Sequence, residues 1–205
     1  MTGLRDRKKQ EMRHRIISEA ATLFAEKGID ATTMEEVAAA SDVSVGTVYN
    51  YFGTKRTLLL AGIGEDTDRM VEAGQAIIET PGDDVVSASK RLVRLYLDDL
   101  VSWDKRLLRE IFGAAFQRVG GVDLTGELAE MDQKLIEQGV VLLSHFKQRG
   151  QLADGVEVYD AAMIIFSVFV LQLFMYMNLD IYEISDLQQQ VDRQIELVFA
   201  GLRSK

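Results

Sequence analysis

Proline occurs only once in this 205-residue chain, at Pro81, and this scarcity constrains the fold more than any other feature. Proline breaks helices because it lacks a backbone N–H and clashes with the preceding turn, so its near absence favours long helices. No segment shows the alternation typical of a strand. We therefore predict an all-α fold of about nine helices. Glycines stand where such helices would end, at Gly28, Gly53, Gly120–Gly121, Gly150 and Gly155.

Apolar residues at helical spacing divide the chain into a head of short helices and a body of longer ones. The head is predicted to comprise residues 1–54 and the body residues 55–205, with a connecting helix at about 55–78. Pro81 and Gly82 mark the end of that connector. The predicted helices span residues 5–27, 34–40, 44–52, 55–78, 84–102, 104–118, 124–149, 157–179 and 185–203.

Charge is distributed unevenly along the chain. The net charge is −9, but residues 1–60 hold nine Lys/Arg and eight Asp/Glu (+1), whereas residues 61–205 hold 14 and 24 (−10). Residues 5–15 alone carry six basic and two acidic side chains (+4). Local charge, and not the total, determines where a nucleic acid can bind. The basic run, including Arg5 and Lys8, is therefore a candidate contact to the DNA backbone, although a solvated terminus has the same composition.

The chain lacks cysteine, which excludes disulfides, a thiol nucleophile and a thiolate metal site. The basic N-terminus leads into no apolar segment of the kind found in signal peptides, so we expect a cytoplasmic protein. The uncharged run 161–179 is long enough to cross a membrane. Ser167 and Gln172 interrupt it, and acids instead of Lys or Arg flank it, so we expect a buried helix and no membrane.

The head has the pattern of a helix-turn-helix. In the segment ATTMEEVAAASD, a threonine can cap a short helix with a glutamate three residues later. Ser41 and Asp42 then form a turn, and Ser44 caps a second short helix that ends near Phe52. Two short helices joined by three or four residues and preceded by a longer helix are typical of this motif.

The second short helix, SVGTVYNYF, presents two different faces. At 100° per residue, Val48 and Phe52 share the inner face, whereas Gly46 and Asn50 point outward, flanked by a Thr and a Tyr. Glycine permits close backbone approach, and Asn, Thr and Tyr side chains can hydrogen-bond base edges or phosphates. This outer face contributes little to folding and is suited to contact with a DNA groove. The alternative interpretation is an ordinary surface helix exposed to solvent.

A resemblance to the DNA-binding region of the tetracycline-repressor (TetR) family of bacterial transcription regulators is carried by one segment, IISEAATLFAEKGIDATTMEEVAAASDVSVGTVYNYFGTKRTLL. It rests on a Thr-Thr pair, on VAAAS-x-V and on GTVYNYF followed by Thr-Lys, and it covers about a quarter of the chain. The resemblance implies that residues 1–54 bind a palindromic double-stranded DNA operator. It also implies that residues 55–205 form a homodimer and hold an effector.

The resemblance implies roles for individual residues as well. Asp42 stands where the family often has Gly, and we expect the turn to survive because Asp tolerates the left-handed conformation. Gly53 replaces a residue that is often basic, so one phosphate contact is in doubt. The implied recognition-helix contacts are Val45, Gly46, Thr47, Tyr49, Asn50 and Tyr51, and the implied phosphate contacts are Thr33 and Lys55.

Two apolar helices of the body predict a homodimer independently. The segment DAAMIIFSVFVLQLFMYMNLD is apolar on every face, which one neighbouring helix cannot cover, and the last helix has a narrower apolar seam. Packing against the same helices of a second copy would bury the surplus, although a monomer core would also account for it. The candidate interface residues are Met163, Val170, Phe174, Leu187, Val191, Ile195, Val198 and Leu202.

Aromatic and isolated polar residues on the apolar helices are candidates for an effector pocket, although core positions share this composition. Gln172 is the most suggestive, because a buried amide needs hydrogen-bond partners that a ligand could supply. The Phe and Met content predicts a small, largely apolar effector, and we expect no cofactor or metal. The candidates are Tyr96, Trp103, Phe112, Phe116, Gln117, His145, Phe166, Phe169, Gln172 and Tyr176.

The connecting helix is expected to transmit effector binding, because it starts at Lys55 beside the DNA and reaches the body. Gly62 and Gly64 make it locally pliable. A tilt of this helix would change the spacing of the two DNA-binding heads in a dimer.

Two other function classes fit less well. An enzyme would need a catalytic constellation, but the only histidines are His14 and His145, and no Ser-His-Asp set or metal cluster is apparent. A helical protein–protein interaction module without DNA binding fits the acidic, apolar body but leaves SVGTVYNYF unexplained. The sequence therefore predicts a sequence-specific, ligand-released repressor.

Overall fold

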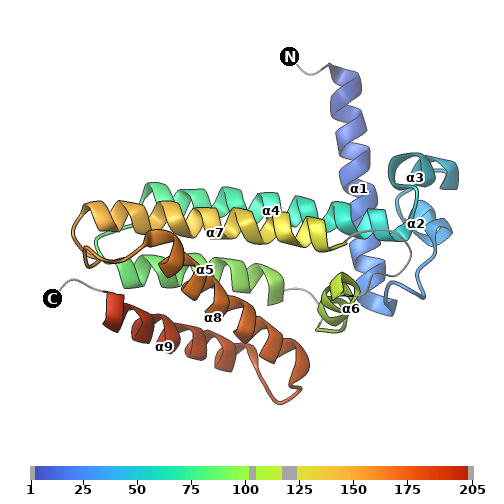
Figure 1. The fold of residues 1–205 in the computed structure, drawn as a ribbon. Coiled ribbons are helices and arrows are strands. Elements are labelled where there is room, and N and C mark those ends of the chain that lie inside the picture. Colours follow the sequence, from blue (N-terminus) through green and yellow to red (C-terminus); the bar gives the residue numbers. More distant parts are fainter. Residues whose placement is uncertain (1–2, 102–104, 117–123, 203–205) are drawn as a thin grey trace. The chain divides into compact units, whose positions relative to one another are not determined.

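The computed structural model describes residues 3–101, 105–116 and 124–202. These residues form helices and connecting loops without a β-strand, which confirms the all-α prediction. Each helix end lies within one residue of its predicted position wherever the predicted end falls in the described part of the chain. The helices are α1 (Leu4–Lys27), α2 (Met34–Ala40), α3 (Val45–Phe52), α4 (Lys55–Glu79), α5 (Val85–Val101), α6 (Lys105–Phe116), α7 (Leu124–Gln148), α8 (Val158–Asn178) and α9 (Ile184–Leu202) (Figure 1).

Local sequence signals explain where the first helices begin and end. Gly28 ends α1 with a φ of 85°, and its N–H donates to the carbonyl oxygen of Phe24 at 2.9 Å. This backbone angle suits glycine, which has no Cβ. At the start of α2, the Thr33 hydroxyl accepts from the Glu36 N–H, while the Glu36 carboxylate accepts from the Thr33 N–H. This is the reciprocal capping box that the sequence predicts.

The chain divides into two compact units. The first consists of Met1–Asp66 with Arg106–Glu127, and the second of Thr67–Lys105 with Leu128–Lys205. Helix α4 is continuous across the division, so both units share it. The boundary after residue 54 separates predicted roles, DNA binding from effector binding and dimerisation, and it stays a prediction.

The first unit has its core where α1, α2, α3 and the first turns of α4 meet. Helix α2 packs against both α1 and α3. The Arg106 side chain, at the start of α6, donates to the Lys27 carbonyl oxygen at the end of α1 (3.3 Å). The buried apolar residues of this unit are Ile16, Ile17, Ala20, Phe24, Met34, Val37, Ala38, Val48, Phe52, Leu58, Leu59, Ile63, Leu107 and Leu108.

The second unit is built from the remainder of α4 with α5, α7, α8 and α9. Helices α5, α8 and α9 pack against one another, as their ribbons show (Figure 1). Helix α7 joins α4 through an ion pair between Lys134 and Asp68 (2.8 Å) and a hydrogen bond from Gln138 Nε2 to the Val71 carbonyl oxygen (2.7 Å). The largest fully buried side chains of this unit are Leu97, Leu142, Leu143, Phe146, Leu152, Leu173 and Phe199.

Helix α8 is less buried than its composition predicts. By length and composition alone it could cross a membrane, and a third (33%) of its most apolar window is buried inside the chain. One face packs inward through residues such as Ile165 and Phe169, whereas Leu171 and Phe174 are each 54% exposed. A single chain therefore leaves part of this apolar helix uncovered, as expected of a helix whose faces one neighbour cannot all cover. The exposed apolar side of α8 is available to a partner.

Candidate functional site

The turn between α2 and α3 gives the helix-turn-helix its geometry. Asp42 adopts a φ of 52°, the left-handed conformation expected of an Asp standing where Gly is common. The next N–H, that of Val43, donates to the Ala38 carbonyl oxygen at 3.0 Å and so holds the turn to the end of α2. The predicted turn is present with Asp in place of Gly.

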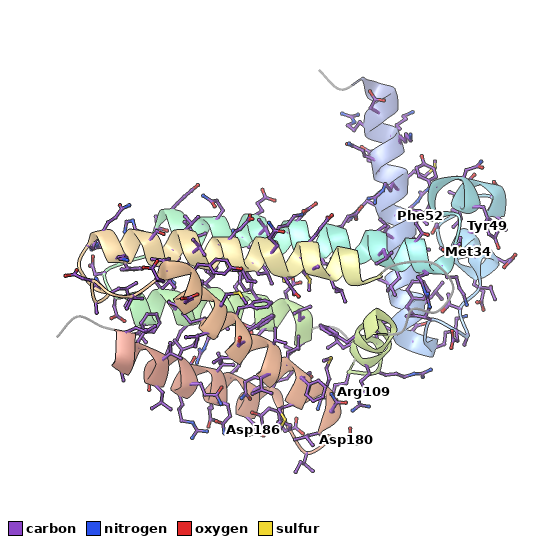
Figure 2. All side chains as sticks on the ribbon, viewed as in Figure 1. Met34, Tyr49, Phe52, Arg109, Asp180 and Asp186 are labelled. Carbon is purple, nitrogen blue, oxygen red and sulfur yellow. The ribbon has the colours of Figure 1, made fainter. Side chains whose placement is uncertain are left out.

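Helix α3 separates into the two faces that its sequence predicts. Val48 is 0% exposed and Phe52 5%, and the Arg13 guanidinium of α1 lies 5.8 Å from the centre of the Phe52 ring. Tyr49, by contrast, is 48% exposed and projects from the outer side of α3 (Figure 2). Asn50 is exposed as well. The face that carries hydrogen-bonding groups is therefore available to a partner.

The other predicted contacts of α3 are partly exposed. The Ser44 hydroxyl caps the helix by accepting the Thr47 N–H at 3.1 Å, and the two hydroxyls lie 2.8 Å apart, where either can donate. Thr47 therefore presents a hydroxyl that already has one partner. The outer-face Gly46 is exposed, and Val45 and Tyr51 flank it with partial exposure.

The two predicted phosphate contacts already hold local structure. Thr33 is exposed, but its hydroxyl donates to Glu36 at 2.9 Å as part of the α2 cap. Lys27 also pairs with Glu36, and this ammonium together with the hydrogen bonds from Thr33 lowers the pKa of the Glu36 carboxyl to about 2. The Lys55 ammonium donates to two carbonyl oxygens of the loop before α2. Sequence reasoning predicted the capping role of Thr33 but missed the contacts of Lys55.

The basic N-terminal run continues as the first turns of α1. Lys8 is exposed, and Arg7 makes an i,i+4 ion pair with Glu11 at 3.4 Å, both well exposed. The Arg5 side chain lies outside the described residues. Further along α1, the Arg13 and His14 side chains both pair with Glu65 of α4, within the first unit.

An apolar cavity lies within the second unit, between α5, α7 and α8. The cavity has a volume of about 30 Å³. Three of the predicted ligand residues line it: Tyr96, Phe166 and Phe169. The centre of the Phe169 ring lies 5.7 Å from that of Phe166 and 6.3 Å from that of Tyr96. The full lining is Ser89, Leu92, Val93, Tyr96, Leu135, Ile136, Gly139, Leu142, Leu143, Ala162, Ile165, Phe166 and Phe169.

The other predicted ligand residues lie elsewhere. Buried Gln172 is satisfied within the chain, because its Oε1 accepts from the Tyr182 hydroxyl at 2.6 Å and its Nε2 donates to Gln194 at 3.2 Å. The ring of buried Tyr176 carries the Lys105 ammonium 4.2 Å from its centre. None of these lines the cavity.

The remaining five ligand candidates do not line the cavity or lie outside the described residues. His145 is exposed, beside Arg149, and Phe112 is partly exposed on α6. Trp103, Gln117 and the Phe116 side chain lie outside the described residues. Among the candidates in the described part of the chain, the three cavity aromatics are therefore the ones that come together.

Two polar residues beside the cavity were missed by sequence reasoning. The Tyr96 hydroxyl donates to Gln138 Oε1 at 2.5 Å, and Gln138 is itself buried. Burial raises the pKa of Tyr96, so its hydroxyl stays protonated. Ser89 is 3% exposed, and its hydroxyl has no hydrogen-bond partner among the described residues. A serine on a mixed-polarity helix gives no sequence signal of this kind.

The predicted dimer residues fall into two groups. Leu187, Val191 and Ile195 are 0% exposed, because the seam of α9 packs against α5 and α8 of the same chain. This corrects the prediction: these three are core residues and are not available to a second copy. Val170 and Phe174 of α8 are exposed, 39% and 54%. Met163, Val198 and Leu202 are partly exposed.

Metal binding finds no support in the described part of the chain, where no three His, Asp or Glu side chains form a cluster that could hold a metal ion.

Comparison with known proteins matches residues 16–61 to the family described as bacterial regulatory proteins, tetR family. The HTH-type transcriptional regulator HbdR of Aromatoleum sp. (strain CIB) is 46% identical over 50 residues. That match covers 24% of this chain and 22% of HbdR, so the chain matches less than a quarter of this relative's length. The family match itself covers the helix-turn-helix with parts of the helices on either side of it.

Solved structures match nearly the whole chain. A TetR-family transcriptional regulator from Mesorhizobium loti MAFF303099 has a TM-score of 0.79 at 20% identity, covering 95% of this chain and 98% of that one. FadR of Thermus thermophilus, a TetR-family transcriptional repressor in complex with lauroyl-CoA, has a TM-score of 0.68 at 20% identity, covering 94% and 96%. Similarity at this identity shows a shared fold. Residues 16–61 thus match the segment that defines the tetR family, and the chain shares its fold with TetR-family regulators over almost its full length.

Proposed function

We propose that this chain is a sequence-specific DNA-binding transcriptional repressor that acts in the cytoplasm, as a homodimer on a palindromic operator, and is released by a small, largely apolar effector. One observation carries the DNA-binding part. The outer face of α3 exposes Tyr49 and Asn50, whereas the inner face alone holds the helix in the core. Exposed hydrogen-bonding groups on the second helix of a helix-turn-helix are positioned for base edges and phosphates.

The exposed side of α8 supports the homodimer. Ile164, Leu171 and Phe174 are between 47% and 54% exposed on a helix without charged side chains between residues 161 and 178. An apolar strip of this kind marks an interaction surface. A two-fold dimer would cover it with the same strip of a second copy, which also places two reading heads on a palindrome.

The effector is the least constrained part of the proposal. The apolar lining of the cavity favours a largely apolar molecule, and FadR, which has the same fold, binds lauroyl-CoA. A cavity with about 30 Å³ for water centres has room for roughly two waters. A molecule as long as an acyl-CoA would therefore require α5, α7 and α8 to separate.

Selection of bound duplexes from random DNA, followed by titration of the selected site at several salt concentrations, tests the DNA-binding function. We expect a palindromic site and an affinity that falls steeply with salt, because each phosphate contact releases a counterion. Absence of retained duplex at low salt would instead favour a protein–protein interaction module. A site without two-fold symmetry would contradict the homodimer.

A further inference from the structure

The walls of the cavity between α5, α7 and α8 are chemically uniform. Every described residue that lines it is uncharged, and only Ser89 and Tyr96 carry a side-chain polar group. Moving an unpaired charge into such surroundings is costly, because nothing in the walls compensates for its lost hydration. The cavity is therefore unsuited to an anionic or cationic group.

The two polar groups in the walls differ in how they are satisfied. The Tyr96 hydroxyl donates to Gln138, whose amide in turn donates to the Val71 carbonyl oxygen. Helical serines commonly hydrogen-bond the carbonyl oxygen four residues earlier. The Ser89 hydroxyl is 3% exposed and makes no such bond, nor any other to the described residues. A buried hydroxyl without a partner is costly, and here it lines the cavity.

We propose that this cavity binds an uncharged, mainly apolar ligand that carries one hydrogen-bonding group, and that the Ser89 hydroxyl is the partner of that group. The proposal deepens the effector part of the proposed function and rests on it. Two features of the cavity indicate this class of ligand. Its uncharged walls exclude an ionised group. The Ser89 hydroxyl, which has no other partner among the described residues, can pair with one polar atom of the ligand. Gly139 of α7 and Ala162 of α8 lie close together in the cavity wall, and neither has a large side chain that would fill the cavity.

Three probes of similar size separate the alternatives: phenol, toluene and benzoate. Phenol and toluene differ by a hydroxyl against a methyl group, and benzoate carries a charge. Each probe is larger than the roughly two waters that the cavity holds, so its binding requires α5, α7 and α8 to move apart slightly. Calorimetric titration of the protein should show binding of phenol and toluene, but not of benzoate. Ser89→Ala should weaken phenol binding about tenfold, as expected for one buried hydrogen bond, and leave toluene binding unchanged or tighter. Chemical-shift changes at the Ala162 methyl group would locate the probes.

Two variants serve as controls. Ser167→Ala removes an exposed hydroxyl of α8 that bonds the Met163 carbonyl oxygen, and it should change neither affinity. Ala162→Leu fills the cavity and should abolish binding of both phenol and toluene. Ser89→Ala should also leave the melting temperature equal or higher, because it removes an unsatisfied buried group.

Several outcomes would overturn the proposal. Equal losses of phenol and toluene in Ser89→Ala would mean that Ser89 only shapes the cavity, and unchanged phenol affinity would mean that its hydroxyl holds water alone. Binding of benzoate, or of no probe at all, would contradict the ligand class. These titrations contain no DNA, so they test the ligand separately from operator binding. The ligand proposal can fail while the protein still binds an operator, and operator binding can fail while the ligand still binds.

Discussion

The Lys55 ammonium lies 2.8 Å from the carbonyl oxygen of Ile29, to which it donates a hydrogen bond, and 2.9 Å from that of Asp30. Both acceptors belong to the loop that joins α1 to α2, so the first residue of α4 fastens this loop. The resemblance to TetR regulators implies a phosphate contact for the same side chain. An ammonium has three donors, and two of them are already used.

Lys55→Met should therefore lower the stability of the fold more than it lowers the affinity for DNA. We expect the free energy of unfolding to fall by about 1 kcal/mol, because one partly buried and one exposed carbonyl group lose a charged donor. Lys8→Met, an exposed change on α1, should leave stability unchanged and lower the slope of log affinity against log salt by about one phosphate contact. Unchanged stability of Lys55→Met in chemical denaturation would contradict the anchoring role.

The outer face of α3 predicts two different effects on operator binding. Tyr49→Phe removes one exposed hydroxyl suited to phosphate and should weaken binding to all sequences alike. Asn50→Ala should alter base preference, at a cost of about 1–3 kcal/mol for the preferred site. Fluorescence anisotropy at matched salt measures both. Tyr159→Phe, at an exposed position of α8, is the matched control for Tyr49→Phe and should change neither affinity nor preference.

The apolar strip of α8 predicts a variant that separates the protomers. Phe174→Asp places a charge where the proposed dimer buries a ring, and an unpaired buried charge is strongly unfavourable. Sedimentation should show mainly monomer at micromolar protein, with weaker operator binding. Val141→Asp, an equally exposed position on α7 (53%), is the control and should sediment as the parent does. A dimeric Phe174→Asp protein would place the interface elsewhere.

Helix positions were predictable from the sequence because their signals are local. The caps at Thr33 and Ser44 and the stop at Gly28 depend only on neighbouring residues, and each is present in the structure. The inner and outer faces of α3 follow from helical geometry, which explains why Phe52 and Tyr49 separate as expected.

The failures share a different physical cause, since they depend on contacts between distant segments. An apolar seam such as Leu187 to Ile195 needs to be covered, but its sequence does not say whether the same chain or a second copy covers it. Gln172 was predicted to contact a ligand because a buried amide needs hydrogen-bond partners. The Tyr182 hydroxyl of the same chain is such a partner. Ser89 gave no signal, because only the surrounding helices leave its hydroxyl unpaired.

The cap of α2 predicts a pH-dependent contribution to stability. The Lys27 ammonium and the Thr33 hydrogen bonds lower the pKa of Glu36 from 4.5 to about 2. A carboxyl with a lowered folded-state pKa stabilises fully above its unfolded pKa and loses this contribution as the pH falls through the folded-state value. The stability difference between the parent and Glu36→Gln should therefore shrink between pH 4.5 and pH 2. Thermal unfolding of the parent and of Glu36→Gln at each pH measures it.

Two glycines of α4 predict opposite responses to the same substitution. A Cβ at Gly64 would meet no atom within 4 Å, whereas a Cβ at Gly74 would lie 2.4 Å from Gln138 Oε1. Gly64→Ala should raise the free energy of unfolding by up to about 1 kcal/mol through helix propensity. Gly74→Ala should lower it by roughly 1–2 kcal/mol, because the displaced amide leaves the buried Tyr96 hydroxyl without its acceptor.

A double-mutant cycle separates this account of Gly74 from a general effect on α4. Gln138→Ala removes the side chain that the new methyl group would strike, and it also costs stability because Tyr96 loses its acceptor. In that background Gly74→Ala has room and should become stabilising, by about the same amount as Gly64→Ala. A Gly74→Ala cost that persists without Gln138 would mean that the glycine serves the helix backbone and not the buried amide.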